Sequence, residues 1–209
     1  MVMATSELSR LITRYGIISD QITSQELTAL LIELQLVLTR SSAGSIVEFG
    51  CYCGTTSLYI RRLLDQHAWR GEFHVYDSFA GLPDKTPRDH SPVGEQFTPG
   101  ELRAAKKDFI MNFKKAGLAP PSIHKAWFSD LALSDIPDNI HFAFLDGDYY
   151  ESIRDSFALI TPKLAKEAVI VVDDYMNEAL PGAAVATDEW LRAHPARMRT
   201  TQSLAIIYS

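Results

Sequence analysis

The sequence has little of what stabilises small secreted or membrane-bound proteins. Its only cysteines, Cys51 and Cys53, are separated by one residue, which would strain a disulfide badly, and a structural zinc ion needs about four ligands. No apolar run approaches the ~20 residues of a membrane-spanning helix, and the N-terminus lacks the basic and apolar pattern of a secretory signal. We therefore expect a cytoplasmic protein with no disulfide or zinc framework and no membrane partner.

Positive charge is also scarce. The 209 residues include 20 Lys and Arg against 26 Asp and Glu, which gives a formal net charge of −6. A surface that follows phosphate backbones needs the opposite balance, so nucleic acid is not expected as a partner. The chain has no internal repeat and is 46% hydrophobic. Its length suits one sizeable core, and we predict a single domain over residues 1–209.

Apolar runs and helical periodicities alternate along the chain. Thr23 and Glu26 form a capping box at the start of one helical pattern. Strands are predicted at 45–49, 73–76, 122–128, 140–145, 168–172 and 203–208, and helices at 6–15, 24–40, 55–66, 101–116, 150–164 and 183–193. This alternation predicts an α/β fold in which N-terminal helices within residues 1–40 precede a mostly parallel sheet with helices on both faces.

Three aspartates directly follow apolar runs that are typical of buried parallel strands. Asp146 follows the run 140–145, and Asp173 and Asp174 follow the run 168–172. The carboxyl ends of parallel strands share one edge of the sheet, where open α/β sheets bind ligands. Because clustered carboxylates repel one another unless a cation lies between them, and because hard ions prefer oxygen ligands, the trio predicts a Mg2+ site. Alternatively, the three aspartates only form turns in water.

The segment 48–54 leaves a predicted strand, turns at two glycines and enters a helix. Glycines at such a turn let the backbone approach a cofactor closely. The third glycine of the dinucleotide fingerprint is absent, so a pyrophosphate is not indicated. Asp77 ends the next strand, where an acid can accept hydrogen bonds from ribose hydroxyls. A nucleoside without phosphates suits this pattern, and Asp130 is a lower-ranked candidate for its adenine or amino-acid end.

A long segment rich in proline, glycine and charge separates the second predicted strand from the next helix. It begins at the ligand edge of the sheet, so we predict that residues 83–100 form an active-site lid that is mobile without ligands. His90 lies in this segment and is a candidate general base, although a loop histidine is more often simply solvated.

Four blocks of the sequence carry a family resemblance. They are Glu-Phe-Gly at 48–50, Asp-Ser-Phe-Ala-Gly-Leu-Pro at 77–83, Leu-Asp-Gly-Asp-Tyr-Tyr-Glu-Ser at 145–152 and Val-Val-Asp-Asp-Tyr at 171–175. In order and spacing they resemble the macrocin O-methyltransferase family over about residues 45–190. The resemblance implies a Rossmann-like class I methyltransferase fold with a mostly parallel seven-stranded sheet. It also implies an O-methyltransferase of antibiotic biosynthesis that uses S-adenosylmethionine and Mg2+ and acts on a small-molecule hydroxyl, such as a sugar of a natural-product glycoside.

The resemblance and the residue pattern together assign roles. Asp146, Asp173 and Asp174 are expected to hold the metal ion, and Asp146 and His90 are the candidates for proton removal. One departure from the family pattern is that Cys51 and Cys53 stand where smaller residues are commoner. The residues expected to contact the cofactor are Glu48, Gly50, Cys51, Tyr52, Gly54, Thr55, Asp77, Ser78, Asp130 and Asp146.

Two other functions remain open at this point. A Mg2+-dependent phosphatase of the haloacid dehalogenase type also uses Asp-x-Asp and Asp-Asp motifs, but its Asp-x-Asp ends the first strand, whereas about 60 residues follow the motif here. A catalytically silent subunit that binds S-adenosylmethionine is the second alternative. The sequence fixes neither a sugar nor a catechol as acceptor, and the N-terminal helices could supply the surface of a homo-oligomer.

Overall fold

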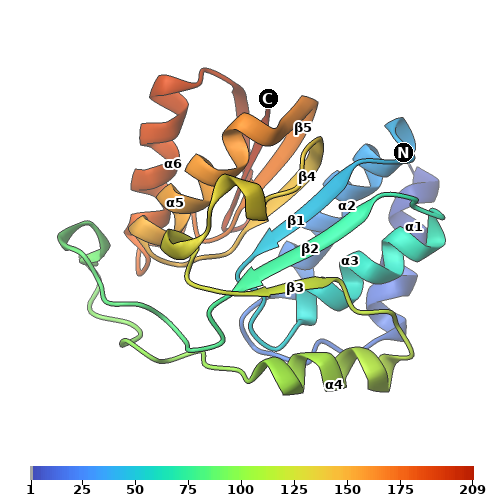
Figure 1. Ribbon diagram of the computed structural model, residues 1–209, viewed down its shortest axis with the longest axis horizontal. Helices are drawn as coiled ribbons and strands as arrows, with labels where there is room; N and C mark the ends of the chain where they lie inside the picture. The colour runs from blue at the N-terminus through green and yellow to red at the C-terminus, as the bar shows by residue number, and fades with distance from the viewer. Residues whose placement is uncertain (1) are drawn as a thin grey trace.

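A seven-stranded sheet forms the centre of the computed structural model, which describes residues 2–209, with side chains from Leu8 onward (Figure 1). The strand order is β3-β2-β1-β4-β5-β7-β6. Strand β7 pairs antiparallel with both β5 and β6, and all other pairs are parallel. This confirms the predicted α/β fold with a mostly parallel sheet. The strands are β1 (Ser45–Phe49), β2 (Glu72–Asp77), β3 (Ser122–Lys125), β4 (Ile140–Leu145), β5 (Leu164–Val172), β6 (Arg197–Thr201) and β7 (Leu204–Tyr208).

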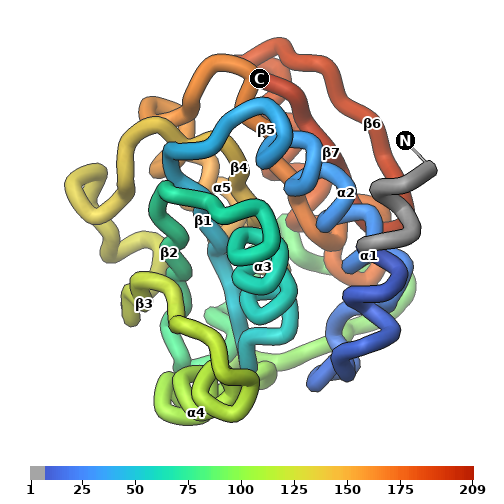
Figure 2. Tube along the Cα trace, turned by 90° about the vertical axis from the view of Figure 1, so that its right-hand side faces the viewer, coloured from blue at the N-terminus to red at the C-terminus, as the bar shows by residue number. Residues whose placement is uncertain are grey.

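Helices cover both faces of the sheet (Figures 1 and 2). On one side lie α1 (Val2–Arg14), α2 (Ser24–Arg40), α3 (Thr55–Gln66) and α4 (Lys106–Ala116), and on the other lie α5 (Tyr150–Ile160) and α6 (Pro181–Ala193). Short 3₁₀ turns occur at η1 (Pro87–Asp89), η2 (Phe128–Asp130), η3 (Leu133–Asp135) and η4 (Thr161–Lys163). Within residues 2–209, no helix is both long and apolar enough to cross a membrane.

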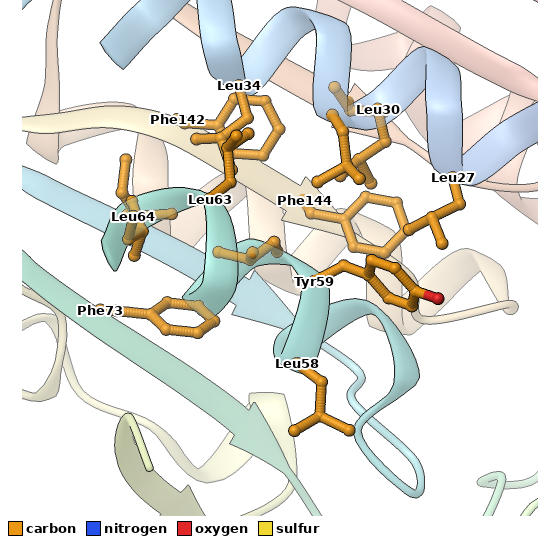
Figure 3. Close-up of a cluster of buried hydrophobic side chains, with 14 of the residues drawn as sticks. Leu27, Leu30, Leu34, Leu58, Tyr59, Leu63, Leu64, Phe73, Phe142 and Phe144 are labelled. Carbon is orange, nitrogen blue, oxygen red and sulfur yellow. The ribbon is translucent and has the colours of Figure 1, made fainter. Parts of the chain in front are cut away.

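The two faces of the sheet bury different side chains because neighbouring residues of a strand point to opposite sides. In β1, Ile46 packs with the helices α1 to α4, and Val47 packs with α5 and α6. Figure 3 shows the larger cluster, in which leucines of α2 and α3 surround Phe142 and Phe144 of β4. Burying a side chain of this size contributes about 1.5–3 kcal/mol, so this packing holds the N-terminal helices to the sheet.

The capping box predicted before α2 is present. The Thr23 hydroxyl accepts a hydrogen bond from the Glu26 backbone N–H at 3.2 Å, and the Glu26 carboxylate accepts one from the Thr23 N–H at 2.8 Å. Two of the N–H groups that a helix leaves unpaired at its start are thereby satisfied.

The bounds of several elements differ from the prediction, and β3 ends at Lys125 where the sequence pattern extended it to 128. Helix α4 begins at Lys106, not at 101, because Glu101 is held in a turn whose carbonyl accepts a hydrogen bond from the Leu82 N–H at 2.8 Å. Helix α5 ends at Ile160 and passes into a 3₁₀ turn that contains Pro162, and β5 then starts at Leu164, where the sequence pattern predicted helix. Proline has no N–H to continue the helical ladder.

The seventh strand implied by the family resemblance is β6, which the hydrophobic pattern did not locate. Its sequence, Arg-Met-Arg-Thr-Thr, has no apolar run, and it occupies the edge of the sheet beside β7. An edge strand needs few apolar side chains, so hydrophobic pattern alone does not reveal it.

Backbone pairing continues one residue past the ends of the central strands. The N–H groups of Gly50, Asp146 and Asp173 donate to the carbonyls of Tyr76, Phe49 and Leu145 at 2.8–2.9 Å. Gly50 has a φ of +85°, and a Cβ at this position would lie 1.8 Å from the Asp146 carbonyl oxygen. Only glycine allows the turn after β1 to pack this closely on the end of β4.

We predict that Gly50→Ala lowers the free energy of unfolding by about 3 kcal/mol or more, because it adds a backbone clash to the strain of a left-handed residue. Gly94→Ala is the matched control: Gly94 has a φ of +107° but open space around it, so only about 1 kcal/mol of backbone strain is expected. Urea denaturation of both variants measures the difference. Equal losses would show that the approach of β1 to β4 is not tight.

Candidate functional site

A cavity of about 220 Å³ opens at the carboxyl edge of the sheet. Gly50, Asp77 and Asp146 line it from the ends of β1, β2 and β4, and Asp174 lines it from the turn after β5. The remaining walls are formed by loops, namely the α1–α2 connection, the long loop after β2 and the segment after β3. The cavity therefore lies where the extended strand pairing gathers the first loop residues.

Four carboxyl groups gather at this edge, and the pKa of each is raised. Burial is the main cause for Asp146, Asp148, Asp173 and Asp174. Charge repulsion within the group adds to the shift for the first three, and the charge of Glu26 adds to it for Asp174. Asp146, Asp148 and Asp174 are partly exposed to the cavity, whereas Asp173 is buried beside it. Each negative charge disfavours the next, which is the electrostatic condition that a bound cation relieves.

The three predicted metal ligands lie at one edge, but protein donors already hold two of them. The Asp173 carboxylate accepts hydrogen bonds from the Ser203 hydroxyl at 3.0 Å and the Asp174 N–H at 2.8 Å. Asp174 accepts one from the Asn177 amide at 2.8 Å. Among the residues that the structure describes, no three His, Cys, Asp or Glu side chains are arranged as a metal-binding group. The oxygen donors and their charge fit Mg2+, although the group is not preassembled.

Asp77 braces the glycine turn. Its carboxylate accepts hydrogen bonds from the N–H groups of Cys51 at 2.8 Å, Tyr52 at 3.0 Å and Phe79 at 2.6 Å. These bonds hold Tyr52 at a φ of +45°, a conformation that costs a non-glycine residue of order 1–3 kcal/mol. The turn between β1 and α3 is therefore fixed by the acid at the end of β2.

Half of the residues predicted to contact the cofactor line the cavity: Gly50, Tyr52, Asp77, Ser78 and Asp146. The others are Glu48, Cys51, Gly54, Thr55 and Asp130, none of which the lining includes. Thr55 is buried and shares a hydrogen bond with Ser19 at 2.9 Å, and Asp130 is exposed at the end of η2.

His90 does not line the cavity either. Its imidazole is 70% exposed and lies 3.0 Å from the Glu95 carboxylate. The loop that carries His90 does reach the cavity, through Pro83, Gln96 and Phe97.

Several lining residues were not singled out from the sequence. Asp148 lines the cavity at a φ of +58°, and the Asp-Gly-Asp motif was the signal that pointed to it. Trp127 and Phe128 also line it. They were missed because an aromatic pair at the end of a strand pattern is expected to pack in the hydrophobic core. Asp20 and Gln21 come from the α1–α2 connection. No sequence pattern there distinguishes a loop that lines a cavity from an ordinary surface loop.

Glu48 lies wholly buried beneath the turn. One carboxyl oxygen accepts a hydrogen bond from the Ser57 hydroxyl at 2.5 Å, and the other has no partner among the described residues. Burial raises the pKa of Glu48 to about 8, and the negative charge of Asp77 adds to the shift. The group is therefore protonated at neutral pH, and it has one oxygen free to meet a polar group of a ligand.

A protein-family profile described as Macrocin-O-methyltransferase (TylF) matches residues 19–202. The matched segment contains every residue that lines the cavity, from Asp20 to Leu180.

Two characterised relatives are 28% identical to the chain. One is the 8-demethyl-8-(2,3-dimethoxy-alpha-L-rhamnosyl)-tetracenomycin-C 4'-O-methyltransferase of Streptomyces olivaceus, matched over 70% of this chain and 58% of that protein. The other is the demethyldecarbamoylnovobiocin O-methyltransferase of Streptomyces niveus, matched over 74% of this chain and 60% of that protein. The match thus spans less than two thirds of either relative.

Solved structures share the fold. The O-methyltransferase NovP superposes with a TM-score of 0.79 at 21% identity, over 100% of this chain and 98% of that one. The O-methyltransferase TomG from Streptomyces achromogenes, solved in complex with SAM, superposes with a TM-score of 0.62 at 14% identity, over 98% of this chain and 88% of that one. Both confirm the predicted arrangement of strands and helices.

We predict that Glu48→Gln removes part of the pH dependence of stability. The folded pKa of about 8 lies above the usual value of 4.5 for a glutamate, so Glu48 costs stability progressively as pH rises from about 4.5 to 8, and the full cost is reached above 8. The variant should therefore gain on the wild type between pH 5 and pH 9, by up to about 4 kcal/mol. Urea denaturation across this range measures the gain, and Glu167→Gln, at an exposed site, serves as control. Parallel curves for wild type and Glu48→Gln would contradict the assignment.

Proposed function

The chain belongs to the macrocin O-methyltransferase family, and from that premise we propose that it transfers a methyl group from S-adenosylmethionine to a small-molecule hydroxyl with the help of Mg2+. The acceptor we propose is a sugar of a natural-product glycoside, because the two relatives are named for tetracenomycin and novobiocin compounds. One cavity carries the proposal. It is lined both by the turn after β1, which Asp77 holds in place, and by carboxyl groups that follow β4 and β5.

The cofactor pocket is proposed to lie between the turn and the segment after β3. Asp77 has fixed the turn and still faces the cavity, where its carboxylate can accept hydrogen bonds from ribose hydroxyls. Trp127 and Phe128, which also line the cavity, supply aromatic surface for a purine to pack against. This surface takes over the role that the sequence pattern gave to Asp130, which is exposed.

The metal ligands are proposed to be Asp146, Asp173 and Asp174. Small side-chain rotations are needed, because Ser203 and Asn177 now hold two of the three carboxylates. Once bound, the cofactor would supply an electrophilic methyl group and the metal ion would lower the pKa of a coordinated hydroxyl.

Proton removal is assigned to Asp148 in preference to Asp146. A carboxylate that binds a cation is a weaker base, and Asp146 is already assigned to the metal. Asp148 lines the cavity, and burial together with the charges of Asp174 and Asp173 raises its pKa, which makes its carboxylate a stronger base than an exposed one. The exposed His90 has no comparable position.

The loop 83–100 is proposed to act as a lid. Pro83, Gln96 and Phe97 lie on the cavity wall, so the loop can exclude water from the acceptor during transfer. We also propose a small-molecule acceptor, a cytoplasmic location and a homo-oligomer formed through the N-terminal helices.

The phosphatase alternative loses support, because the family match covers the whole cavity and the Asp-Gly-Asp motif follows the fourth strand. The silent-subunit alternative predicts S-adenosylmethionine binding without any effect of Mg2+. The following experiment separates it from the enzyme.

We predict that calorimetry detects S-adenosylmethionine binding to the wild type, and that Mg2+ binds to this complex. Asp173→Asn should abolish Mg2+ binding while cofactor affinity stays within about threefold, since Asp173 lies outside the ribose site. Asp130→Asn should change neither. Absence of cofactor binding to folded wild-type protein, with and without Mg2+, would refute the proposed function.

We predict that Asp148→Asn lowers kcat for methylation of a desmethyl glycoside by about 10²–10⁴, the usual contribution of a general base. Cofactor affinity should not change, because the amide has nearly the same shape. Initial rates measured with radiolabelled S-adenosylmethionine provide the test, with Asp130→Asn as the exposed control. A kcat within twofold of the wild type would move the base to another residue.

A further inference from the structure

We propose that Asp89 is a positioning residue that docks the tip of loop 83–100 onto the starts of α5 and α6 and so fixes the loop against the cavity. Its effect on catalysis rests on the proposed function. The docking itself does not, and it can be measured without any substrate.

Asp89 is unusual for a loop acid because it is only 2% exposed. One carboxylate oxygen accepts a hydrogen bond from the Tyr150 backbone N–H at 2.6 Å. The other accepts hydrogen bonds from the Thr86 N–H and the Thr86 hydroxyl, both at 2.8 Å. The carboxylate thus closes the turn η1 with one oxygen and binds a helix 61 residues away with the other.

The Tyr150 N–H is the first of helix α5, and Tyr149 at the cap position provides no side-chain hydrogen bond. The four N–H groups at the start of a helix need acceptors and favour a negative charge. Asp89 supplies both from a distant segment, so α5 and the loop stabilise one another.

Helix α6 leaves room for this carboxylate. A Cβ on Gly182, in the first turn of α6, would lie 1.9 Å from an Asp89 carboxylate oxygen and 2.6 Å from the Tyr150 nitrogen. Alanine is normally the better helix former, so glycine at this position is required by the close approach of Asp89 and of the α5 backbone, and not by helix α6 itself.

Neighbouring contacts hold the same tip. Arg88 forms an ion pair with Glu189 of α6 and lies over the Tyr150 ring, and the Tyr150 hydroxyl donates to Glu189 at 2.7 Å. The Ser91 hydroxyl donates to the Glu178 carbonyl at 2.9 Å. Since these groups are more exposed than Asp89, they contribute less to docking.

Docking at the tip controls both arms of the loop. At the base, the Gly100 N–H donates to the Leu82 carbonyl at 2.9 Å and the Leu82 N–H donates to Glu101. With base and tip both fixed, the two arms pass the cavity, where Leu82 and Phe97 pack with Tyr149 and Leu180. Release of Asp89 would leave the base and the more exposed tip contacts of Arg88 and Ser91 as attachments, and the arms could then move away from the acceptor side.

Trypsin cleavage after Lys85 tests this directly. Lys85 lies in the first arm, its side chain is 14% exposed and its ammonium lies 5.6 Å from the centroid of the Tyr149 ring, so cleavage requires the arm to leave the protein surface. Substitution of Asp89 alters the residue next to the Arg88 scissile bond, and it also frees the Thr86 N–H at the Lys85 scissile bond. Asp89→Ala is therefore read together with Gly182→Ala, which leaves the bonds between Asp89 and Thr86 available. Cleavage after Lys85 is followed by mass spectrometry at a temperature at which every variant is folded.

Asp89→Ala is expected to raise the rate of cleavage after Lys85 by about tenfold or more, the order expected for loss of a hydrogen bond to a charged group. Asp89→Asn should be intermediate, because its carbonyl can still accept from Tyr150. The matched control is Asp135→Ala: Asp135 closes the turn η3 by accepting the Ala132 N–H at 2.8 Å but is exposed. An unchanged rate in Asp89→Ala, or an equal rise in Asp135→Ala, would overturn the proposal.

Gly182→Ala gives a second approach if Asp89→Ala does not fold. It should accelerate cleavage after Lys85 although it adds a better helix former, and unchanged cleavage in a folded variant would again overturn the proposal. Calorimetry with S-adenosylhomocysteine on the same samples keeps the two hypotheses apart. Failure of the wild type to bind this ligand would refute the proposed function, whereas the docking role of Asp89 is decided by the proteolysis alone.

Discussion

The site depends on backbone hydrogen bonding between parallel strands that continues one residue beyond the strand ends. The N–H groups of Gly50, Asp146 and Asp173 each bond to the neighbouring strand, so the first residue of each loop is as fixed as the sheet itself. The close contact between Gly50 and the Asp146 carbonyl is the tightest point of this arrangement. Side chains that begin within one residue of a rigid sheet need little further support to converge, and this explains how loops that are separate in sequence form one cavity.

The same convergence costs stability. Carboxylates are well solvated in water, and at this edge they lose part of that solvation. Burial therefore raises the pKa of each of Asp146, Asp148, Asp173 and Asp174. Buried like charges of this kind are characteristic of functional sites, where a ligand or ion restores the balance. The large apolar clusters on both faces of the sheet offset that cost.

The sequence pattern predicted those parts of the fold that depend on buried apolar strands. The runs that became β1, β4 and β5 were apolar and short, so both the strands and the acids after them were predictable. Pattern does not report where a loop travels. His90 and Asp130 follow strands in sequence but turn toward solvent, whereas Phe97 and Gln21 reach the cavity from segments without periodicity. The docking of Asp89 joins segments 61 residues apart, and no local rule detects such a contact.

The edges of the sheet have a consequence of their own. Strand β6 presents Arg197 and Arg199 at one edge, and β3 ends in Lys125 at the other. An exposed edge offers unpaired backbone groups to any other strand, and cationic side chains are a common defence against that pairing. A chain with a net negative charge thus keeps some of its cations at the two edges where strands of another copy would otherwise pair.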